Sequence, residues 1–271
     1  MFIKPKVTLL HATPIIIGEI AGRTCYDSFS LSENEEVVDF PASKQFDKDI
    51  DSSALLHKLS HVFHHESVLE HINLTFHIED INRAVLIEAT RHRIGIAFSV
   101  RSTRYTMGKI LKVALWAYHK NNPALFTDYV KSVGLFTVVD ESIKGGLAIS
   151  LWDKIITIYM KQDFKDNCML ITPKEAPESY NTNNIDIILK LKVKKNVGDN
   201  WKWIVDETWA VSLVFSLNLR ALKHFLSLRN AGSAWFAIRN MAQAMQDEVD
   251  VKYLELILKS KEIEEIKQGR K

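Results

Sequence analysis

The stretch INLTFHIEDINRAVLIEATRHR, residues 72–93, contains a strand, a helix and the start of a basic segment. Over its first eight residues apolar side chains alternate with polar ones, which is the two-residue period of a half-buried strand. Asp80 can cap a helix, so we predict that one follows it and ends near Arg91. Strands and helices are interspersed without regular alternation elsewhere in the chain. This pattern favours the α+β class, with an antiparallel or mixed sheet and packed helices.

The rest of the chain is predicted to form further strands and helices, with no internal repeat and no low-complexity linker. Thr13 is expected to cap the first helix, with Pro14 at its first position. Residues 30–50 are polar and acidic, which predicts a surface loop. The predicted strands are 6–12 and 207–218, the predicted hairpin lies between 184 and 206, and the predicted helices are 13–29, 52–65, 147–162, 219–230 and 233–249.

The composition is that of an ordinary soluble globular protein. The chain has 271 residues, and its 35 Lys and Arg against 33 Asp and Glu give a net charge of +2. This balance provides no overall field for a long polyanion, so we expect no nucleic-acid partner, and any anion site must be local. Because the start is too polar for a signal peptide and no long apolar stretch follows, we expect a cytoplasmic protein without a membrane partner. Cys25 and Cys168 make no disulfide framework and no zinc spacing, and no metal is expected.

A basic segment, RHRIGIAFSVRSTRYTM at residues 91–107, concentrates four arginines in this nearly neutral chain. Arginine matches phosphate oxygens with a planar fork of donors, and serine hydroxyls and backbone N–H groups can complete such a site. No glycine-rich loop precedes a helix, which argues against a Rossmann or P-loop phosphate site. The alternative is that the arginines form structural ion pairs with acids nearby in sequence, which are Glu66, Glu70, Glu79 and Glu88. The residues alone leave both interpretations open.

The basic segment is one of several motifs that occur in order along the chain. AGRTCYDSF at 21–29 and HESVLEH at 65–71 precede it, and PESY at 177–180 and SLNLRALKHFLSLR at 216–229 follow it. With these motifs the chain resembles the flavin-dependent thymidylate synthases, whose signature is Arg-His-Arg, a seven-residue gap and Ser-x-Arg. The resemblance covers most of residues 10–245.

The resemblance implies an enzyme of the methyltransferase type that converts dUMP to dTMP. In the family, 5,10-methylenetetrahydrofolate donates the carbon to C5 of dUMP, FAD supplies the hydride and NADPH reduces the flavin. No protein cysteine acts as the nucleophile, and Cys25 is expected to pack on its helix. The family also implies a homotetramer with active sites between subunits. A single domain is expected over 1–250, with 251–271 as a charged C-terminal helix or tail.

Site residues follow from the resemblance by position. Arg229 is implied as the catalytic residue, which holds dUMP and polarises the uracil carbonyl. His65 is expected to reach the folate or the flavin ring. The positions that match dUMP-binding residues are Glu88, Arg91, Ser102, Thr103, Arg104, Lys174 and Arg229. The positions that match FAD-binding residues are His65, Ser67, Glu70, His92, Arg93, Ile94, Asn218, Arg220 and His224.

The chain departs from the family signature in the basic segment. Eight residues separate Arg93 from Ser102, one more than the family pattern has. An extra residue in a strand would turn the following side chains to the other face, so we predict a bulge or loop between Gly95 and Phe98. Val100 stands where many members have a glutamate, so one common contact to dUMP or water is absent.

Other departures affect the FAD motif, the turn motif and the length of the chain. His224 replaces an asparagine near the adenine of FAD. Lys174 is the nearest cation to an arginine expected before the turn. Residues 181–207 form an insertion relative to shorter members, and this hairpin could cover the active-site mouth or extend a subunit interface.

The helix at 219–230 is predicted to serve two sites. Arg220 and His224 are four residues apart and share a face, whereas Arg229 lies nine residues past Arg220 and points nearly opposite. A ligand on each face fits active sites built between subunits. Two other functions compete with this one: a nucleic-acid-binding protein that is not an enzyme, and a chain that binds FAD and dUMP but has lost the folate chemistry.

Overall fold

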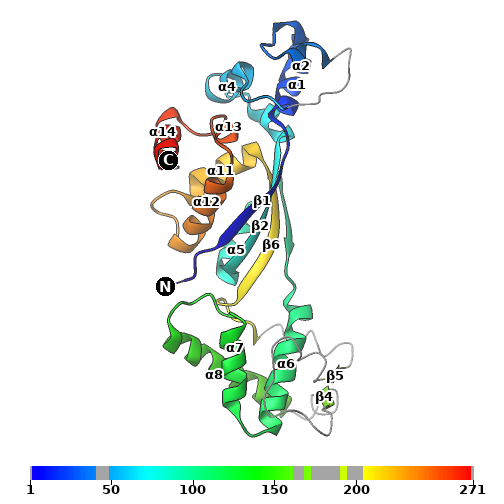
Figure 1. Ribbon diagram of the computed structural model, residues 1–271, viewed down its shortest axis with the longest axis vertical. Helices are drawn as coiled ribbons and strands as arrows, with labels where there is room; N and C mark the ends of the chain where they lie inside the picture. The colour runs from blue at the N-terminus through cyan, green and yellow to red at the C-terminus, as the bar shows by residue number, and fades with distance from the viewer. Residues whose placement is uncertain (1, 41–48, 161–167, 172–189, 194–203, 270–271) are drawn as a thin grey trace. The chain divides into compact units, whose positions relative to one another are not determined.

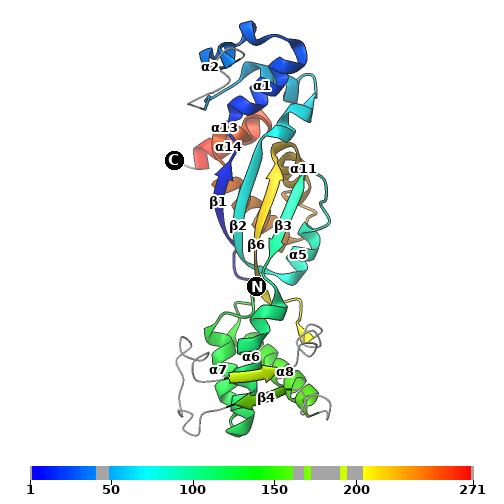
Figure 2. The same cartoon turned by 90° about the vertical axis from the view of Figure 1, so that its right-hand side faces the viewer.

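A computed structural model gives the structure of the chain, which divides into two compact units (Figures 1 and 2). The sheet unit comprises Lys4–Glu79, Ile87–Ser99 and Ser212–Lys271, and the helical unit comprises Met1–Ile3, Asp80–Leu86 and Val100–Val211. The structure describes residues 2–40, 49–160, 168–171, 190–193 and 204–269, with the backbone alone for 103–106, 168–171 and 190–193.

The sheet unit is built on a four-stranded sheet of order β1-β2-β6-β3. The strands are β1 (Lys6–Ala12), β2 (Asn73–Asn82), β3 (Ile96–Val100) and β6 (Ala210–Asn218). β1 and β2 are antiparallel. Leu74, Phe76 and Ile78 are fully buried on one face of β2, and the polar residues between them are only partly buried. The alternation predicted from the sequence is therefore confirmed, and it gives the sheet one face for a core.

Two helices pack on this buried face, α11 (Leu219–Arg229) and α12 (Phe236–Glu248), and Figures 1 and 2 both show them on the same side of the sheet. Phe225 of α11 meets Phe215 of β6 edge to face, with ring centroids 5.7 Å apart. Asn218 caps α11, because its Oδ1 accepts from the backbone N–H of Ala221 at 2.8 Å. The predicted strand and helix are confirmed here, and the cap fixes where α11 begins.

Shorter helices complete the sheet unit. They are α1 (Ile15–Tyr26), η1 (Phe29–Leu31), α2 (Glu35–Val38), α4 (Ala54–His61), η2 (Glu66–His71), α13 (Val251–Leu254) and α14 (Ser260–Gly269). α1, α4 and η2 contact one another, and η2 also contacts α11. η1 and α2 fall where the sequence predicts a loop, so that prediction is wrong for these residues. Val37 of α2 is fully buried, which explains why a polar, acidic segment still folds onto the unit.

The helical unit has a core of its own. Its helices are α6 (Thr103–His119), α7 (Pro123–Ser132) and α8 (Glu141–Tyr159), and α5 (Arg83–Ala89) begins in it and ends in the sheet unit. The three longer helices contact one another around the buried side chains of Trp116, Phe126 and Ile155. Asn122 and Asp140 cap α7 and α8 by accepting backbone N–H bonds.

Two predicted helix starts are wrong. Pro14, not Thr13, is the N-cap residue of α1, and it makes no side-chain cap bond. Asp80 lies inside β2, and Asn82 caps α5 because its Oδ1 accepts from the N–H of Val85 at 2.8 Å. The strand continues past Asp80 because the next residues are still buried, as the burial pattern of β2 shows.

The predicted hairpin between 184 and 206 is described in part. β5 (Lys190–Val193) is a strand within it, and its described partner is β4 (Cys168–Ile171), to which it is antiparallel. The turn NVGDN of the prediction lies outside the described residues. No helix in the described part of the chain is both long and apolar enough to cross a membrane.

Candidate functional site

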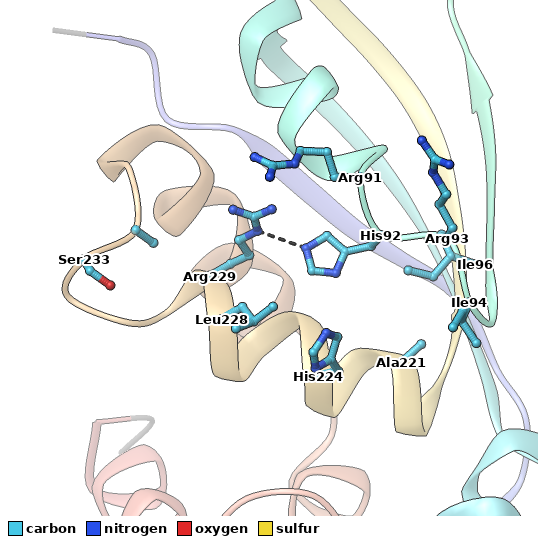
Figure 3. A pocket seen from close by; sticks show the side chains of 11 residues that line it. Arg91, His92, Arg93, Ile94, Ile96, Ala221, His224, Leu228, Arg229 and Ser233 are labelled. Carbon is cyan, nitrogen blue, oxygen red and sulfur yellow. Dashed lines mark hydrogen bonds between the residues drawn. The ribbon is translucent and has the colours of Figure 1, made fainter.

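The first half of the basic segment links α5 to β3 in the sheet unit (Figure 3). Gly95 adopts a left-handed backbone with φ of +69°, and its carbonyl accepts from the N–H of Asn218 at 3.0 Å. A Cβ at Gly95 would lie 2.3 Å from Nδ2 of Asn218. Of the bulge or loop predicted between Gly95 and Phe98, the structure has a turn at Ile94 and Gly95, and β3 begins at Ile96.

Arg229 is the last residue of α11, and it is held by Glu88 of α5 and by His92, which follows α5. Its Nε donates to Nε2 of His92 at 3.0 Å, its Nη1 donates to Oε2 of Glu88 at 3.0 Å, and its Nη2 donates to the backbone carbonyl of Glu88 at 3.1 Å. Arg91 donates to Oε1 of the same carboxylate at 3.1 Å. Glu88 thus holds two arginines that are 138 residues apart in sequence.

His92 is buried against α11, and its ring is neutral at pH 7. The pKa of His92 falls from its usual 6.5 to about 4, chiefly because burial removes water from the ring. Arg229 and His224 act in the same direction. Arg91 also lowers the pKa, and Glu88 opposes it. Because an arginine only donates, Nε2 of His92 must carry the lone pair and Nδ1 the proton.

We call the first cavity beside this network the arginine pocket. Its volume is about 610 Å³, within the range of small-molecule sites. Its lining residues are Arg91, His92, Arg93, Ile94, Ile96, Ala221, His224, Leu228, Arg229, Ser233 and Ala234. None of these described residues is acidic, and Arg93 forms no ion pair with any residue that the structure describes. Three guanidinium groups against the carboxylate of Glu88 make the pocket positive, so it favours an anion.

A second cavity, the charge-balanced pocket, has a volume of about 510 Å³. It is lined by Glu66, Glu70, Ile94, Asn218, Arg220, Ala221, Lys223, His224 and Ser227. Arg220 pairs with Glu70 at 2.5 Å, and Lys223 pairs with Glu66 at 2.6 Å. The cations of this pocket are therefore neutralised by its own acids, in contrast to those of the arginine pocket.

The two pockets share a wall made by Ile94, Ala221 and His224. Arg220 lines one pocket and Arg229 the other, as the spacing on α11 predicts. His224 is placed differently from the prediction, since it lines both pockets. Ile94 is 88% exposed, which is unusual for a large apolar residue and leaves it available to a ligand.

The two interpretations of the basic segment each hold for part of it. Glu88 pairs with Arg91 and Arg229, and Glu70 pairs with Arg220, so structural ion pairs are present. The arginine pocket nevertheless keeps an excess of positive charge, because Arg93 is added to the two arginines that share one carboxylate.

His65 and Ser67 are exposed and line neither of the two pockets. The hydroxyl of Tyr26 lies 3.2 Å from Nδ1 of His65, within hydrogen-bond distance. His64, with φ of +54°, turns the chain after α4 so that the N–H of His65 donates to the carbonyl of Leu59. The backbone and a tyrosine therefore fix His65, which directly precedes Glu66 of the charge-balanced pocket.

The second half of the basic segment belongs to the helical unit. Ser102 is the N-cap residue of α6, and Thr103 and Arg104 are the first residues of that helix, with side chains that the structure does not describe. Arg101 donates to the backbone carbonyl of Ala210. Lys174 lies outside the described residues. The contacts predicted for these four dUMP positions therefore stay predictions.

Sequence reasoning missed several pocket residues. Lys223 follows Arg220 by three residues, so helical spacing places both on one face and is the signal that could have found it. Ser233 and Ala234 lie in the loop after α11, where no periodic spacing in the sequence could have identified them. The pocket residues absent from the sequence-based set are Ile96, Ala221, Lys223, Ser227, Leu228, Ser233, Ala234 and Glu66.

The buried His92 predicts a dependence of stability on pH. Because its pKa in the folded protein, about 4, lies below the usual 6.5, the unfolded chain takes up a proton first as the pH falls. The stability that the neutral ring contributes is complete above pH 6.5 and is lost between pH 6.5 and 4. We expect urea unfolding to show a smaller loss of stability over this range for His92→Gln than for the wild type. Identical pH profiles for the two proteins would contradict the assignment.

Comparison with known proteins gives consistent matches over most of the chain. A sequence model of the family described as thymidylate synthase complementing protein matches residues 8–252. A flavin-dependent thymidylate synthase from Helicobacter pylori is 27% identical over 242 residues, which cover 89% of this chain and 92% of the relative. One from Campylobacter jejuni is 28% identical over 240 residues, which cover 89% of each chain.

Solved structures give the same fold. A crystal structure of thymidylate synthase X from Helicobacter pylori with FAD and dUMP is similar with a TM-score of 0.61 and 22% identity, and the match covers 93% of this chain and 97% of that one. A second structure from the same organism, also complexed with FAD and dUMP, gives a TM-score of 0.60 at 24% identity. The predicted α+β fold is confirmed.

Proposed function

Because the chain belongs to the flavin-dependent thymidylate synthase family, whose members are methyltransferase-type enzymes, we propose that it binds dUMP and FAD and converts dUMP to dTMP. The observation that carries the proposal is the arginine pocket. Arg91 and Arg229 share the single carboxylate of Glu88 there, and Arg93 adds a third positive charge to the lining. A second pocket shares the wall of this one. An anionic mononucleotide would neutralise this excess charge.

The nucleotide is assigned to the arginine pocket. Arg91 and Arg229 both reach Glu88, so a ligand that binds there meets two arginines whose positions are already set. Arg229 uses three of its five N–H groups within the protein, which leaves two for the nucleotide. A guanidinium fixed in this way stabilises negative charge that develops on the uracil ring, because it needs no reorganisation.

FAD is assigned to the charge-balanced pocket and the shared wall. The residues present fit such a group: Arg220 and Lys223 are donors, Asn218 lines the pocket beside them, and the exposed Ile94 offers an apolar surface to a ring. When bound, FAD supplies the hydride that completes the methyl group. The prediction that Cys25 packs on its helix is wrong, because Cys25 is exposed on α1. It lines neither pocket, and the proposed reaction uses no contribution from it.

Several further parts of the proposal rest on the family resemblance. The carbon donor is 5,10-methylenetetrahydrofolate, and NADPH reduces the flavin. Ser102, Thr103, Arg104 and Lys174 complete the dUMP site, and His65 and Ser67 contribute to the flavin or folate site. The chain assembles as a homotetramer with active sites between subunits, and it acts in the cytoplasm as a single domain over 1–250, which residues 181–207 interrupt as an insertion.

A flavin spectrum of the purified protein, titrated with dUMP, tests the binding part of this proposal. We expect a yellow protein whose flavin absorbance changes as dUMP saturates the site. Release of tritium from C5-labelled dUMP, with methylenetetrahydrofolate and NADPH supplied, tests the reaction. A colourless protein that binds oligonucleotides in a salt-sensitive manner would contradict the proposal, and a flavoprotein that binds dUMP without tritium release would contradict the reaction alone.

Arg220→Ala should deplete the bound flavin. The substitution removes the cation of the charge-balanced pocket that pairs with Glu70, and it leaves that carboxylate facing the ligand. We expect the ratio of flavin to protein absorbance to fall at least about tenfold, since a charged hydrogen bond contributes about 1.5–3 kcal/mol. Arg239→Ala is the matched control, because Arg239 lines neither pocket. Equal flavin content in the two variants would remove Arg220 from the site.

A further inference from the structure

His92 lines the arginine pocket, and its ring contacts both Arg229 and Phe225 of α11, the helix whose residues line the two pockets. We propose that His92 is a positioning residue, which uses the lone pair of its Nε2 to set the plane of the Arg229 guanidinium against dUMP. The inference rests on the proposed function, and it gives His92, which the family resemblance matches to an FAD position, a role toward Arg229 in the arginine pocket. In Figure 3 the ring lies between Arg229 and His224 and is joined to the former by the hydrogen bond.

The ring itself is held firmly. His92 is 9% exposed, and its backbone N–H donates to the carbonyl of Ala89 at 3.2 Å. Phe225 of α11 contacts the ring edge to face with centroids 4.9 Å apart, and His224 does so at 5.8 Å. A ring packed in this way can determine where its hydrogen-bond partner lies, rather than follow it.

The bond to Nε of Arg229 has a different effect from the bonds to Glu88. The carboxylate and the backbone carbonyl of Glu88 accept from Nη1 and Nη2, so Glu88 fixes only the two terminal nitrogens of Arg229. The Nε atom lies in the guanidinium plane, at the end that joins the aliphatic part of the side chain. A bond to it therefore restrains rotation of the plane about the side chain. Three bonds from two directions therefore orient the two N–H groups that remain for a ligand.

His92 can also strengthen its bond to Arg229 when a ligand occupies the arginine pocket. Since Nε2 accepts, Nδ1 carries a proton, and no residue that the structure describes accepts a hydrogen bond from it. His92 lines the arginine pocket, so this N–H is available to a ligand there. A ligand that accepts from Nδ1 makes Nε2 a better acceptor for Arg229, because hydrogen bonds in a chain strengthen one another.

Burial first, and then the charges around it, keep the ring in the accepting state. The groups that face it are Arg229 and His224 from α11, and Arg91 and Glu88 from the residues before it. Three of these four oppose a proton on the ring. A protonated ring would direct an N–H at the Arg229 N–H, and the positioning bond would break.

Two substitutions separate positioning from simple structural support. Glutamine places its carbonyl oxygen close to the position of Nε2, whereas asparagine reaches only to the position of Nδ1. We expect His92→Asn to lower kcat/KM for dUMP by about 10- to 100-fold, the loss expected for one charged hydrogen bond. His92→Gln should restore the value to within about threefold of the wild type. Equal losses in both variants, at equal flavin content, would overturn the inference.

A double-mutant cycle shows whether the effect passes through Arg229. If it does, His92→Asn has no further effect in an Arg229→Ala background, for kcat/KM and for the dUMP dissociation constant measured by calorimetry. Full additivity of the two losses would overturn the inference.

The crystal structure of His92→Asn tests the positioning without reference to activity. We expect the guanidinium of Arg229 to turn away from its wild-type plane while Glu88 keeps its bond to Arg91. A wild type that releases no tritium would overturn the proposed function but not this displacement, whereas an unmoved Arg229 would overturn the positioning role alone.

Discussion

Arg229→Ala is expected to lower the turnover of dUMP by at least about 100-fold, while the fold stays intact. Two charged hydrogen bonds to the nucleotide would be lost, at about 1.5–3 kcal/mol each. The fold is spared because Arg229 lies at the last residue of α11 and Glu88 keeps its bond to Arg91. Tritium release from C5-labelled dUMP measures the turnover, and thermal unfolding measures the fold.

Arg229→Lys is the informative companion to this variant. Lysine keeps the charge but cannot hold His92 and both groups of Glu88 at once while presenting a planar fork to the ligand. We therefore expect it to rescue only part of the loss. Unchanged kinetics in Arg229→Ala would remove the central residue of the proposed site.

Gly95→Ala is expected to destabilise the sheet unit by about 2–3 kcal/mol and to lower its flavin content. An alanine at a left-handed backbone costs about 1–2 kcal/mol, and the new Cβ would lie 2.3 Å from Nδ2 of Asn218. Asn218 must then move, which weakens the cap of α11 at a cost of about 1 kcal/mol. Thermal unfolding and the flavin absorbance of the purified variant measure the two effects.

Gly134→Ala is the matched control. Gly134 has φ of +59°, close to that of Gly95, but a Cβ there would meet nothing within 4 Å. Its substitution should therefore cost only the backbone strain and should leave the flavin content unchanged. If both variants behave alike, the contact of Gly95 with Asn218 has no separate effect on α11.

The elements with a strong apolar period were the ones that the sequence could predict. β2 and α11 bury every second and every third or fourth residue, so burial and sequence pattern agree. No helix is predicted over α6, although Met107, Ile110 and Leu111 are buried on one face of it. Its first turns contain Thr103, Thr106 and Gly108, which are weak helix formers and obscure the start.

Helix starts and ion pairs were harder to predict. The N-cap of α5 is decided by how far β2 continues in the sheet, and a local pattern does not contain that information. The partner of Arg229 is 141 residues away at Glu88, and four nearby acids were equally good candidates by sequence. The sequence does not contain which carboxylate the arginines share; that is decided where the last residue of α11, Arg229, meets Glu88 of α5.

The wall that Ile94, Ala221 and His224 form between the two pockets has a consequence for inhibition. One elongated molecule, with an anionic group for the arginine pocket and a flat, uncharged group for the charge-balanced pocket, would displace together the two ligands that we propose for them. A single substitution at His224 would alter both pockets, so a variant that resists such an inhibitor would also bind the proposed ligands less well.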